Sequence, residues 1–313
     1  VGARMLPWSY VINTARHLQQ EAGARQIFAP LPDAQATPLV GGRRVAVLVI
    51  GESARGDRLR LYGYERDTNA HTAGLGVVAV PGVRACASYT LAALNCILSH
   101  KGHTAPSRAD MGEPLPTYLQ RQGVDVIWRS ANSGEPALKV RWFERAGELG
   151  RACDGPGCEQ ADWDGILLHQ LRQRVEQSQA DRVLVVLHLS GSHGPAYHRK
   201  VPPGFERFQP VCQTVVLKDC EPQALRNAYD NTIAYTDHVL ARLSRLLSET
   251  GWASAWLYVS DHGESLGEAG LYLHGTPGLL APREQLEIPM LMWFSEPGRQ
   301  ALGVDPARAA RAR

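Results

Sequence analysis

The chain has 313 residues, of which 44% are hydrophobic and 20% charged, and its formal net charge at pH 7 is +2. This composition is ordinary for a globular protein with a sizeable core. The small net charge and the lack of a block of like charges argue against a nucleic-acid partner. No apolar run reaches the roughly 18 residues that a membrane-spanning helix needs, and no signal peptide is visible.

The first part of the chain, residues 1–42, mixes short helical runs with a segment rich in proline and glycine. We expect it to be a linker that leads into a single domain formed by residues 43–313. The chain begins VGARMLPWSY, with its first methionine at position 5. We therefore expect a fragment of a longer protein, and the missing membrane helix says little about that parent.

Five apolar runs predict buried strands. They are RRVAVLVIGES, GVDVIWRSANSG, DRVLVVLHLSGSHGP, WLYVSDHGES and EIPMLMWFS. Helical patterns lie between them, and the clearest covers about 222–249, where Pro222 suits the first turn. Strands that alternate with helices predict an α/β fold, a three-layer α/β/α sandwich with a mainly parallel sheet. The proline-rich region from about 196 to 222 is predicted to be a long surface insertion.

The six cysteines fall into three close pairs, and none has the CxxC spacing of a zinc knuckle. The pairs are Cys86 and Cys96, Cys153 and Cys158, and Cys212 and Cys220. Their closeness along the chain, above all in CDGPGC, favours three local disulfides. Such bridges indicate an oxidising compartment. The alternative is six unrelated buried thiols.

Polar residues follow three of the predicted strands, at the ends where ligands bind in open α/β sheets. They are Glu52 after the first strand, Ser192 and His193 after the third, and Asp261, His262 and His274 after the fourth. Carboxylates combined with imidazoles favour zinc or manganese. The alternative for the Asp-His pair is a plain loop with a helix-capping aspartate. His188 lies inside an apolar run and is interpreted as a core histidine.

Thr90 opens a short helical pattern between Cys86 and Cys96. A hydroxyl at a helix N-terminus lies beside free backbone N–H groups and the positive end of the helix dipole, which together favour an anionic phosphate. A threonine hydroxyl is a weak nucleophile until a metal or a base removes its proton. The alternative is that Thr90 is only a helix N-cap.

Four segments resemble the lipid A phosphoethanolamine transferases, a family in the sulfatase-like branch of the alkaline phosphatase superfamily that includes the enzymes of transferable colistin resistance. The segments are VLVIGESARGDRLRLYGYERDTN, GSHGPAY, YDNTIAYTD and SDHGESLGEAGLYLHG. The resemblance runs from about residue 43 to about 296. It implies that Glu52, Asp261 and His262 bind one tight zinc ion together with Thr90, which becomes phosphorylated. It also implies that His193 and His274 hold the phosphoryl group or a second zinc.

The resemblance further implies a setting and two substrates. Such enzymes are disulfide-bonded and lie at the periplasmic face of the bacterial inner membrane, tethered by an N-terminal membrane domain. We therefore expect this chain to be the catalytic domain, working as a monomer. Phosphatidylethanolamine is the expected donor and a lipid A phosphate of lipopolysaccharide the expected acceptor.

The chain also departs from the family pattern, which affects the acceptor. Ser88 and Asn95 replace residues usual around the nucleophile, and Glu135 and Pro136 stand where many lipid A enzymes have a cysteine and a substrate lysine. Asn132 and Lys139 are the two residues of this region that we consider for substrate contact. The alternatives are the same chemistry on a core sugar or periplasmic glucan, a phosphoglycerol transferase or phosphatase, and a non-catalytic lipopolysaccharide- or metal-binding module.

Overall fold

The computed structural model describes residues 28–34, 41–105, 107, 111–153 and 158–305. Its centre is a seven-stranded sheet in the order β2–β9–β6–β1–β5–β3–β4. The strands are β1 (Arg44–Gly51), β2 (Val78–Val80), β3 (Asp125–Ser130), β4 (Trp142–Arg145), β5 (Arg182–His188), β6 (Ala253–Ser260) and β9 (Met290–Phe294). Strands β1, β3, β4, β5 and β6 are parallel, β9 is antiparallel to β6, and β2 is antiparallel to β9. The predicted mainly parallel sheet is confirmed.

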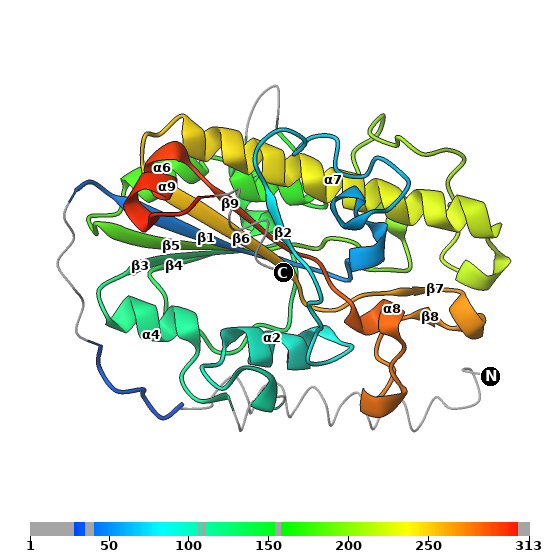
Figure 1. The fold of residues 1–313 in the computed structure, drawn as a ribbon, viewed down its shortest axis with the longest axis horizontal. Helices are drawn as coiled ribbons and strands as arrows, with labels where there is room; N and C mark the ends of the chain where they lie inside the picture. The colour runs from blue at the N-terminus through cyan, green and yellow to red at the C-terminus, as the bar shows by residue number, and fades with distance from the viewer. Residues whose placement is uncertain (1–27, 35–40, 106, 108–110, 154–157, 306–313) are drawn as a thin grey trace.

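Helices cover both faces of the sheet and complete the predicted α/β/α sandwich (Figure 1). Helices α6 (Leu171–Glu176) and α7 (Pro222–Ser248) lie over one face, and α2 (Thr90–Leu98) and α4 (Leu115–Arg121) lie over the other. The remaining described α-helices are α5 (Ala146–Ala152), α8 (Arg283–Leu286) and α9 (Glu296–Leu302). Strands β7 (Ser265–Leu266) and β8 (Tyr272–Leu273) form a separate two-stranded ribbon.

Strand β5 shows why the predicted strands have continuous apolar runs. Alternate side chains of a strand point to opposite faces of the sheet. Val183, Val185 and Leu187 join the larger core cluster, which also contains the buried face of α7. Leu184 and Val186 join a smaller cluster with α2. Because both faces are covered by helices, both sets of side chains are buried and the run shows no polar alternation.

The five predicted strands and the long helix are confirmed, as β1, β3, β5, β6, β9 and α7. Sequence analysis missed the edge strands β2 and β4, which have three and four residues. The prediction of a surface insertion at 196–222 is wrong in part. Within it, Tyr197, Val201 and Leu217 are buried in the larger core cluster, so this segment helps to close the core beside α7.

The predicted lead-in of residues 1–42 lies mostly outside the described residues. Of the parts described, residues 28–34 bond to the region of α4: the Leu31 N–H donates to Glu113 Oε2 at 2.8 Å, and the Ala34 N–H donates to Gln122 Oε1 at 3.0 Å. This segment therefore lies against the domain. The boundary at residue 42 stays a prediction.

All three predicted disulfides are confirmed. The bridges join Cys86 to Cys96, Cys153 to Cys158 and Cys212 to Cys220, and they account for all six cysteines. The bridges close short loops of 10, 5 and 8 residues in sequence separation. Each therefore stiffens one local segment, and none joins distant parts of the chain.

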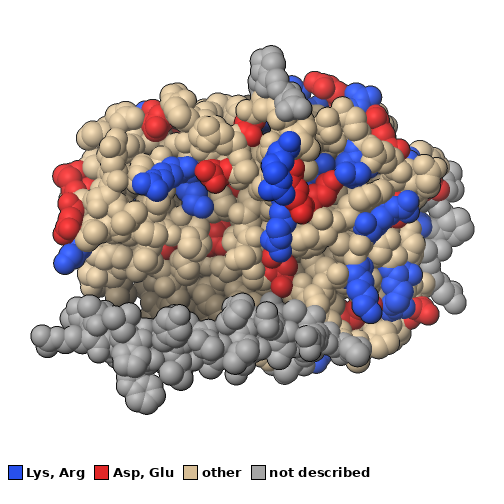
Figure 2. Space-filling model, turned by 180° about the vertical axis from the view of Figure 1, so that it is seen from behind, with Lys and Arg blue, Asp and Glu red and all other residues tan. Residues whose placement is uncertain are grey.

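The surface carries charges of both signs. Figure 2 shows basic and acidic side chains interspersed on the face opposite to the view of Figure 1, so that face has no large field of one sign. Within the described residues, no helix combines the length and the apolar character needed to cross a membrane.

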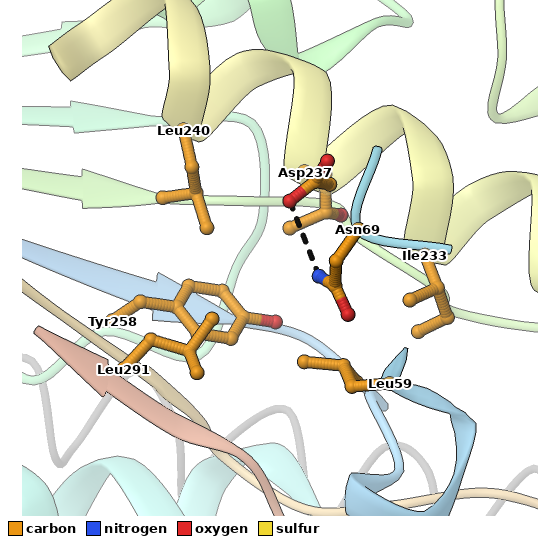
Figure 3. A pocket seen from close by; sticks show the side chains of 8 residues that line it. Leu59, Asn69, Ile233, Asp237, Leu240, Tyr258 and Leu291 are labelled. Carbon is orange, nitrogen blue, oxygen red and sulfur yellow. Dashed lines mark hydrogen bonds between the residues drawn. The ribbon is translucent and has the colours of Figure 1, made fainter. Parts of the chain in front are cut away.

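A small internal cavity lies between α7 and the sheet (Figure 3). It is lined by Leu59, Asn69, Ile233, Thr236, Asp237, Leu240, Tyr258 and Leu291. The Asn69 amide donates to Asp237 Oδ1 at 3.1 Å, and Asp237 Oδ2 accepts the His71 N–H at 2.7 Å. Burial raises the pKa of Asp237, and the hydrogen bonds from Thr72 and Asn69 offset this rise only in part. These bonds fix the loop after Leu59 to α7, so we assign the cavity a structural role.

Candidate active site

The predicted site residues meet at the carboxyl ends of three adjacent strands, β6, β1 and β5. Glu52 directly follows β1, Asp261 and His262 follow β6, and His193 lies in the loop after β5. Thr90 is the first residue of α2, on the face of the sheet opposite α7 (Figure 1). Parallel strands place their carboxyl ends at one edge of a sheet, which explains why residues far apart in the sequence converge there.

The Thr90 hydroxyl points at the buried polar cluster. Its Oγ1 lies 3.1 Å from Glu52 Oε2 and 3.3 Å from His262 Nε2. Glu52 and His262 have no exposed surface, whereas Thr90 is only partly buried. The N-cap alternative is wrong, because Tyr89 occupies the N-cap position and Thr90 follows it inside the helix. The hydroxyl therefore does not cap the helix and instead contacts the polar cluster.

The donor set fits a metal cation. His262 Nε2 lies 3.3 Å from Glu52 Oε1 and 3.4 Å from Asp261 Oδ2. Asp261 Oδ2 is buried and has no hydrogen-bond partner among the described residues. His262 Nδ1 lies 2.8 Å from the Gly263 carbonyl oxygen, which can only accept, so the lone pair of Nε2 is left for a ligand. A cation among these atoms would satisfy the orphaned oxygen and separate two like charges.

The pKa shifts of the two carboxyl groups point the same way. Burial raises the pKa of Asp261 well above its usual range, and the nearby negative charge of Glu52 raises it further. Burial also raises the pKa of Glu52, but the charge of His262 and the hydrogen bond from Ser53 outweigh it and lower this pKa. Without a cation only one of the two groups is readily ionised. A bound cation would stabilise both carboxylates.

The β7–β8 ribbon returns the chain so that His274 faces the same site. The ring centroids of His262 and His274 are 4.4 Å apart, and those of His193 and His274 are 5.0 Å apart. Glu52, His262 and His274 each offer a ligand atom within 4.8 Å of the others. At Gly263 a Cβ atom would collide with the Glu284 carbonyl oxygen, so only glycine fits this close approach.

Glu264 is a site residue that the sequence analysis missed. Its side chain is fully buried, and Oε1 lies 3.1 Å from His274 Nδ1. Its Oε2 accepts the Gly194 N–H at 3.3 Å, directly beside His193. Glu264 therefore orients the His274 ring and holds the backbone that follows His193. Its place two residues after His262 was a usable signal, because the same loop already held two expected ligands.

The two residues considered for substrate contact separate in the structure. Asn132 lies in the site, and its amide donates to Glu52 Oε2 at 2.7 Å and to the Leu189 carbonyl at 3.0 Å. Lys139 is exposed, and its backbone N–H donates to Thr117 Oγ1 at 3.0 Å. No described contact ties the Lys139 side chain to the other site residues, and substrate contact by Lys139 stays a prediction.

The comparisons with known proteins agree with this geometry. The model of the sulfatase family matches residues 44–311. The chain belongs to the sulfatase family. Phosphoethanolamine transferase EptA of Helicobacter pylori is 38% identical over 307 residues, which cover 96% of this chain and 56% of that protein. The chain spans about half the length of the curated relatives it matches.

Two solved structures place this sulfatase-family domain more narrowly. The soluble domain of lipooligosaccharide phosphoethanolamine transferase A from Neisseria meningitidis is 34% identical with a TM-score of 0.79, covering 89% of this chain and 86% of that one. The integral membrane form of the same enzyme is 31% identical with a TM-score of 0.82, covering 98% of this chain and 59% of that one. The resemblance to the phosphoethanolamine transferase family is confirmed.

The Cys86–Cys96 bridge brackets Thr90 and is expected to matter more for activity than the Cys153–Cys158 bridge. Replacing either pair with serine should cost about 2–3 kcal/mol of stability, because each bridge restricts the unfolded chain. Removal of the Cys86–Cys96 bridge alone should also lower the turnover per folded molecule, since it frees the segment before α2. Thermal unfolding and specific activity of both double variants test this. An equal loss of activity per folded molecule would contradict the expected order.

His193 is expected to serve the phosphoryl group, with no ligand atom for the tight metal. The His193 ring lies against His274, with ring centroids 5.0 Å apart, whereas Glu52, Asp261 and Thr90 lie directly around His262 Nε2. We expect His193→Ala to slow phosphoryl transfer by about 100-fold, a usual loss for an acid–base or charge-stabilising group. The bound metal should remain, as elemental analysis would show. Loss of the tight metal in this variant would show that His193 is a metal ligand.

Proposed function

We propose that this domain transfers phosphoethanolamine from phosphatidylethanolamine to a lipid A phosphate, with Thr90 as the residue that carries the group between them. The main support is the position of Thr90 Oγ1 at a helix N-terminus, 3.1 Å from Glu52 Oε2 and 3.3 Å from His262 Nε2. The proposal is supported by the related soluble domain, whose name describes a lipooligosaccharide phosphoethanolamine transferase.

The residues proposed to hold one tight zinc ion are Glu52, Asp261, His262 and Thr90. Bound zinc would supply Lewis-acid stabilisation of the negative charge that develops at the reacting oxygens. His274 and His193 face the same space and are proposed to hold phosphate oxygens. The alternative role proposed for these two histidines is to bind a second zinc ion. Glu264 fixes the orientation of His274 through Nδ1 at 3.1 Å.

The transfer is proposed to proceed in two steps, first to Thr90 and then from Thr90 to the acceptor. Thr90 Oγ1 attacks the phosphorus of phosphatidylethanolamine, the bond from phosphorus to the diacylglycerol oxygen breaks, and diacylglycerol leaves with the proton that Thr90 loses. An oxygen of the acceptor phosphate then attacks the phosphorus. The bond to Thr90 breaks, and Oγ1 regains a proton. His193 or His274 is placed to pass a proton to a departing oxygen in each step.

The domain is proposed to act as a monomer at the periplasmic face of the bacterial inner membrane, tethered by an N-terminal membrane domain. Three disulfides support an oxidising compartment. The integral membrane relative supports the tether. Both proposed substrates are anchored in lipid, and a tether raises their effective concentration around the enzyme.

The test is to incubate the zinc-loaded domain with vesicles of phosphatidylethanolamine and to map the protein by mass spectrometry. One phosphoethanolamine group should appear on the peptide that contains Thr90. Adding lipid A should discharge it, whereas adding periplasmic glucan should not. Phosphoethanolamine on another residue would refute the role of Thr90. Discharge by glucan alone would refute lipid A as the acceptor and leave the chemistry of the first step intact.

A further inference from the structure

A second buried polar cluster lies behind Glu52, across the ends of β3 and β5. It consists of Ser130, Asn132, Glu135 and His188, none of which belongs to the proposed ligand set. The Glu135 side chain is 5% exposed and that of His188 is 0% exposed. A buried carboxylate is costly unless it is paired and hydrogen-bonded, so the place of Glu135 requires an explanation.

Asn132 is the member of this cluster that reaches the active site. Its two amide hydrogens are used by Glu52 Oε2 at 2.7 Å and the Leu189 carbonyl at 3.0 Å, and its Oδ1 accepts the Ser133 N–H at 2.8 Å. The amide donors are therefore committed to the protein. Asn132 orients the Glu52 carboxylate, and its amide has no donor left for substrate.

Glu135 holds the turn that presents Asn132. Its Oε1 accepts a hydrogen bond from the Ser130 hydroxyl and lies 3.1 Å from His188 Nδ1. The same Ser130 oxygen accepts the Asn132 N–H at 3.1 Å. From outside, Arg145 Nη1 donates to the Asn132 carbonyl at 3.3 Å, and Arg145 Nη2 lies 3.9 Å from Glu135 Oε2. A continuous set of short polar contacts therefore links Glu135 to Glu52.

We propose that Glu135 is a positioning residue that acts through Ser130 and Asn132 to fix the Glu52 carboxylate for the metal. This inference rests on the proposed zinc site. Groups that hold a metal ligand in place change metal affinity by about 10–100-fold when they are removed. The Glu135 carboxylate is two contacts further out than Asn132, so its effect should lie at the lower end of that range.

The test measures the zinc dissociation constant of the folded domain by competition with a chromophoric chelator. We expect Asn132→Ala to weaken zinc binding by about 10–100-fold and Glu135→Leu by about 10-fold. Glu135→Gln should stay within about threefold of the wild type, because its amide oxygen still accepts from Ser130 and from His188 Nδ1–H. Ser130→Ala, a small change that keeps the fold, should weaken binding in the same direction as Glu135→Leu.

The matched control is Glu144→Gln. Glu144 is also a largely buried carboxylate near β3, paired with Arg129 at 2.8 Å, but its ion pairs with Arg129 and Arg174 lead away from Glu52. This variant should lose stability and keep the zinc dissociation constant. Unchanged zinc affinity in Glu135→Leu, beside tight binding by the wild type, would overturn the positioning role alone. A wild type that binds no zinc would overturn the proposed function and this role together.

Discussion

Thr90→Ala is expected to abolish the covalent adduct and to reduce lipid turnover by at least about 1,000-fold, because removal of a nucleophile usually costs this much or more. The nearby hydroxyl of Ser53 cannot replace it readily, because Ser53 is fully buried and its Oγ donates to Glu52 Oε1 at 2.7 Å. Thr90 is the first residue of α2 and is not its N-cap residue, so its loss should leave the helix folded. Mass spectrometry after incubation with lipid measures the adduct.

Two variants separate chemistry from folding in this experiment. Thr90→Ser keeps the hydroxyl and should keep a measurable adduct at a reduced rate. Thr104→Ala removes an exposed hydroxyl that donates to the Lys101 carbonyl at 2.9 Å, next to its own short turn Gly102–Thr104, and should leave turnover unchanged. If Thr90→Ala keeps its fold and turns over lipid at the wild-type rate, Thr90 does not carry the group.

Sequence analysis could predict the sheet because its central strands contain apolar runs of several residues. The clearest are VAVLVI in β1 and VLVVL in β5, and β5 is buried on both faces, so the sequence of each strand alone indicates its burial. The edge strands β2 and β4 have only three and four residues, too few to give such a signal, and β4 is also partly exposed. Their pairing depends on contacts with distant strands, which no local pattern records.

The site residues also fall into two groups, those that local sequence could predict and those that it could not. Glu52, Asp261 and His262 follow predicted strands, and the alignment of strand ends brings them together. The pairing of Glu264 with His274 spans 10 residues, and that of Glu135 with His188 spans 53. Both pairs depend on how loops fold back onto the sheet. Local sequence therefore pointed to the proposed ligands, while the residues that orient them became visible only in three dimensions.

Asp261→Asn is expected to weaken zinc binding by at least about 100-fold, more than loss of an orienting group, because it removes a charged ligand. Asparagine can keep both hydrogen bonds of Oδ1, from the Ser53 N–H at 3.1 Å and the His262 N–H at 2.7 Å. The fold should therefore persist, and the loss should be confined to the metal. Elemental analysis and chelator competition measure it. Asp219→Ala, a change of an exposed carboxylate, is the control and should bind zinc as the wild type does.

The same variant should change stability with opposite signs in the presence and absence of zinc. Free zinc at 1,000 times the dissociation constant stabilises a folded protein by about 4 kcal/mol, and a 100-fold weaker site keeps only about 1.4 kcal/mol of that. When a chelator removes the zinc, the order of the two stabilities should reverse. Burial and the charge of Glu52 raise the pKa of Asp261, so ionising it opposes folding as the pH rises through that pKa, and asparagine escapes this cost. Thermal unfolding at neutral pH should therefore show Asp261→Asn below the wild type with zinc and at or above it with chelator. A variant less stable than the wild type by the same amount in both buffers would show that Asp261 supports the fold and does not bind the metal.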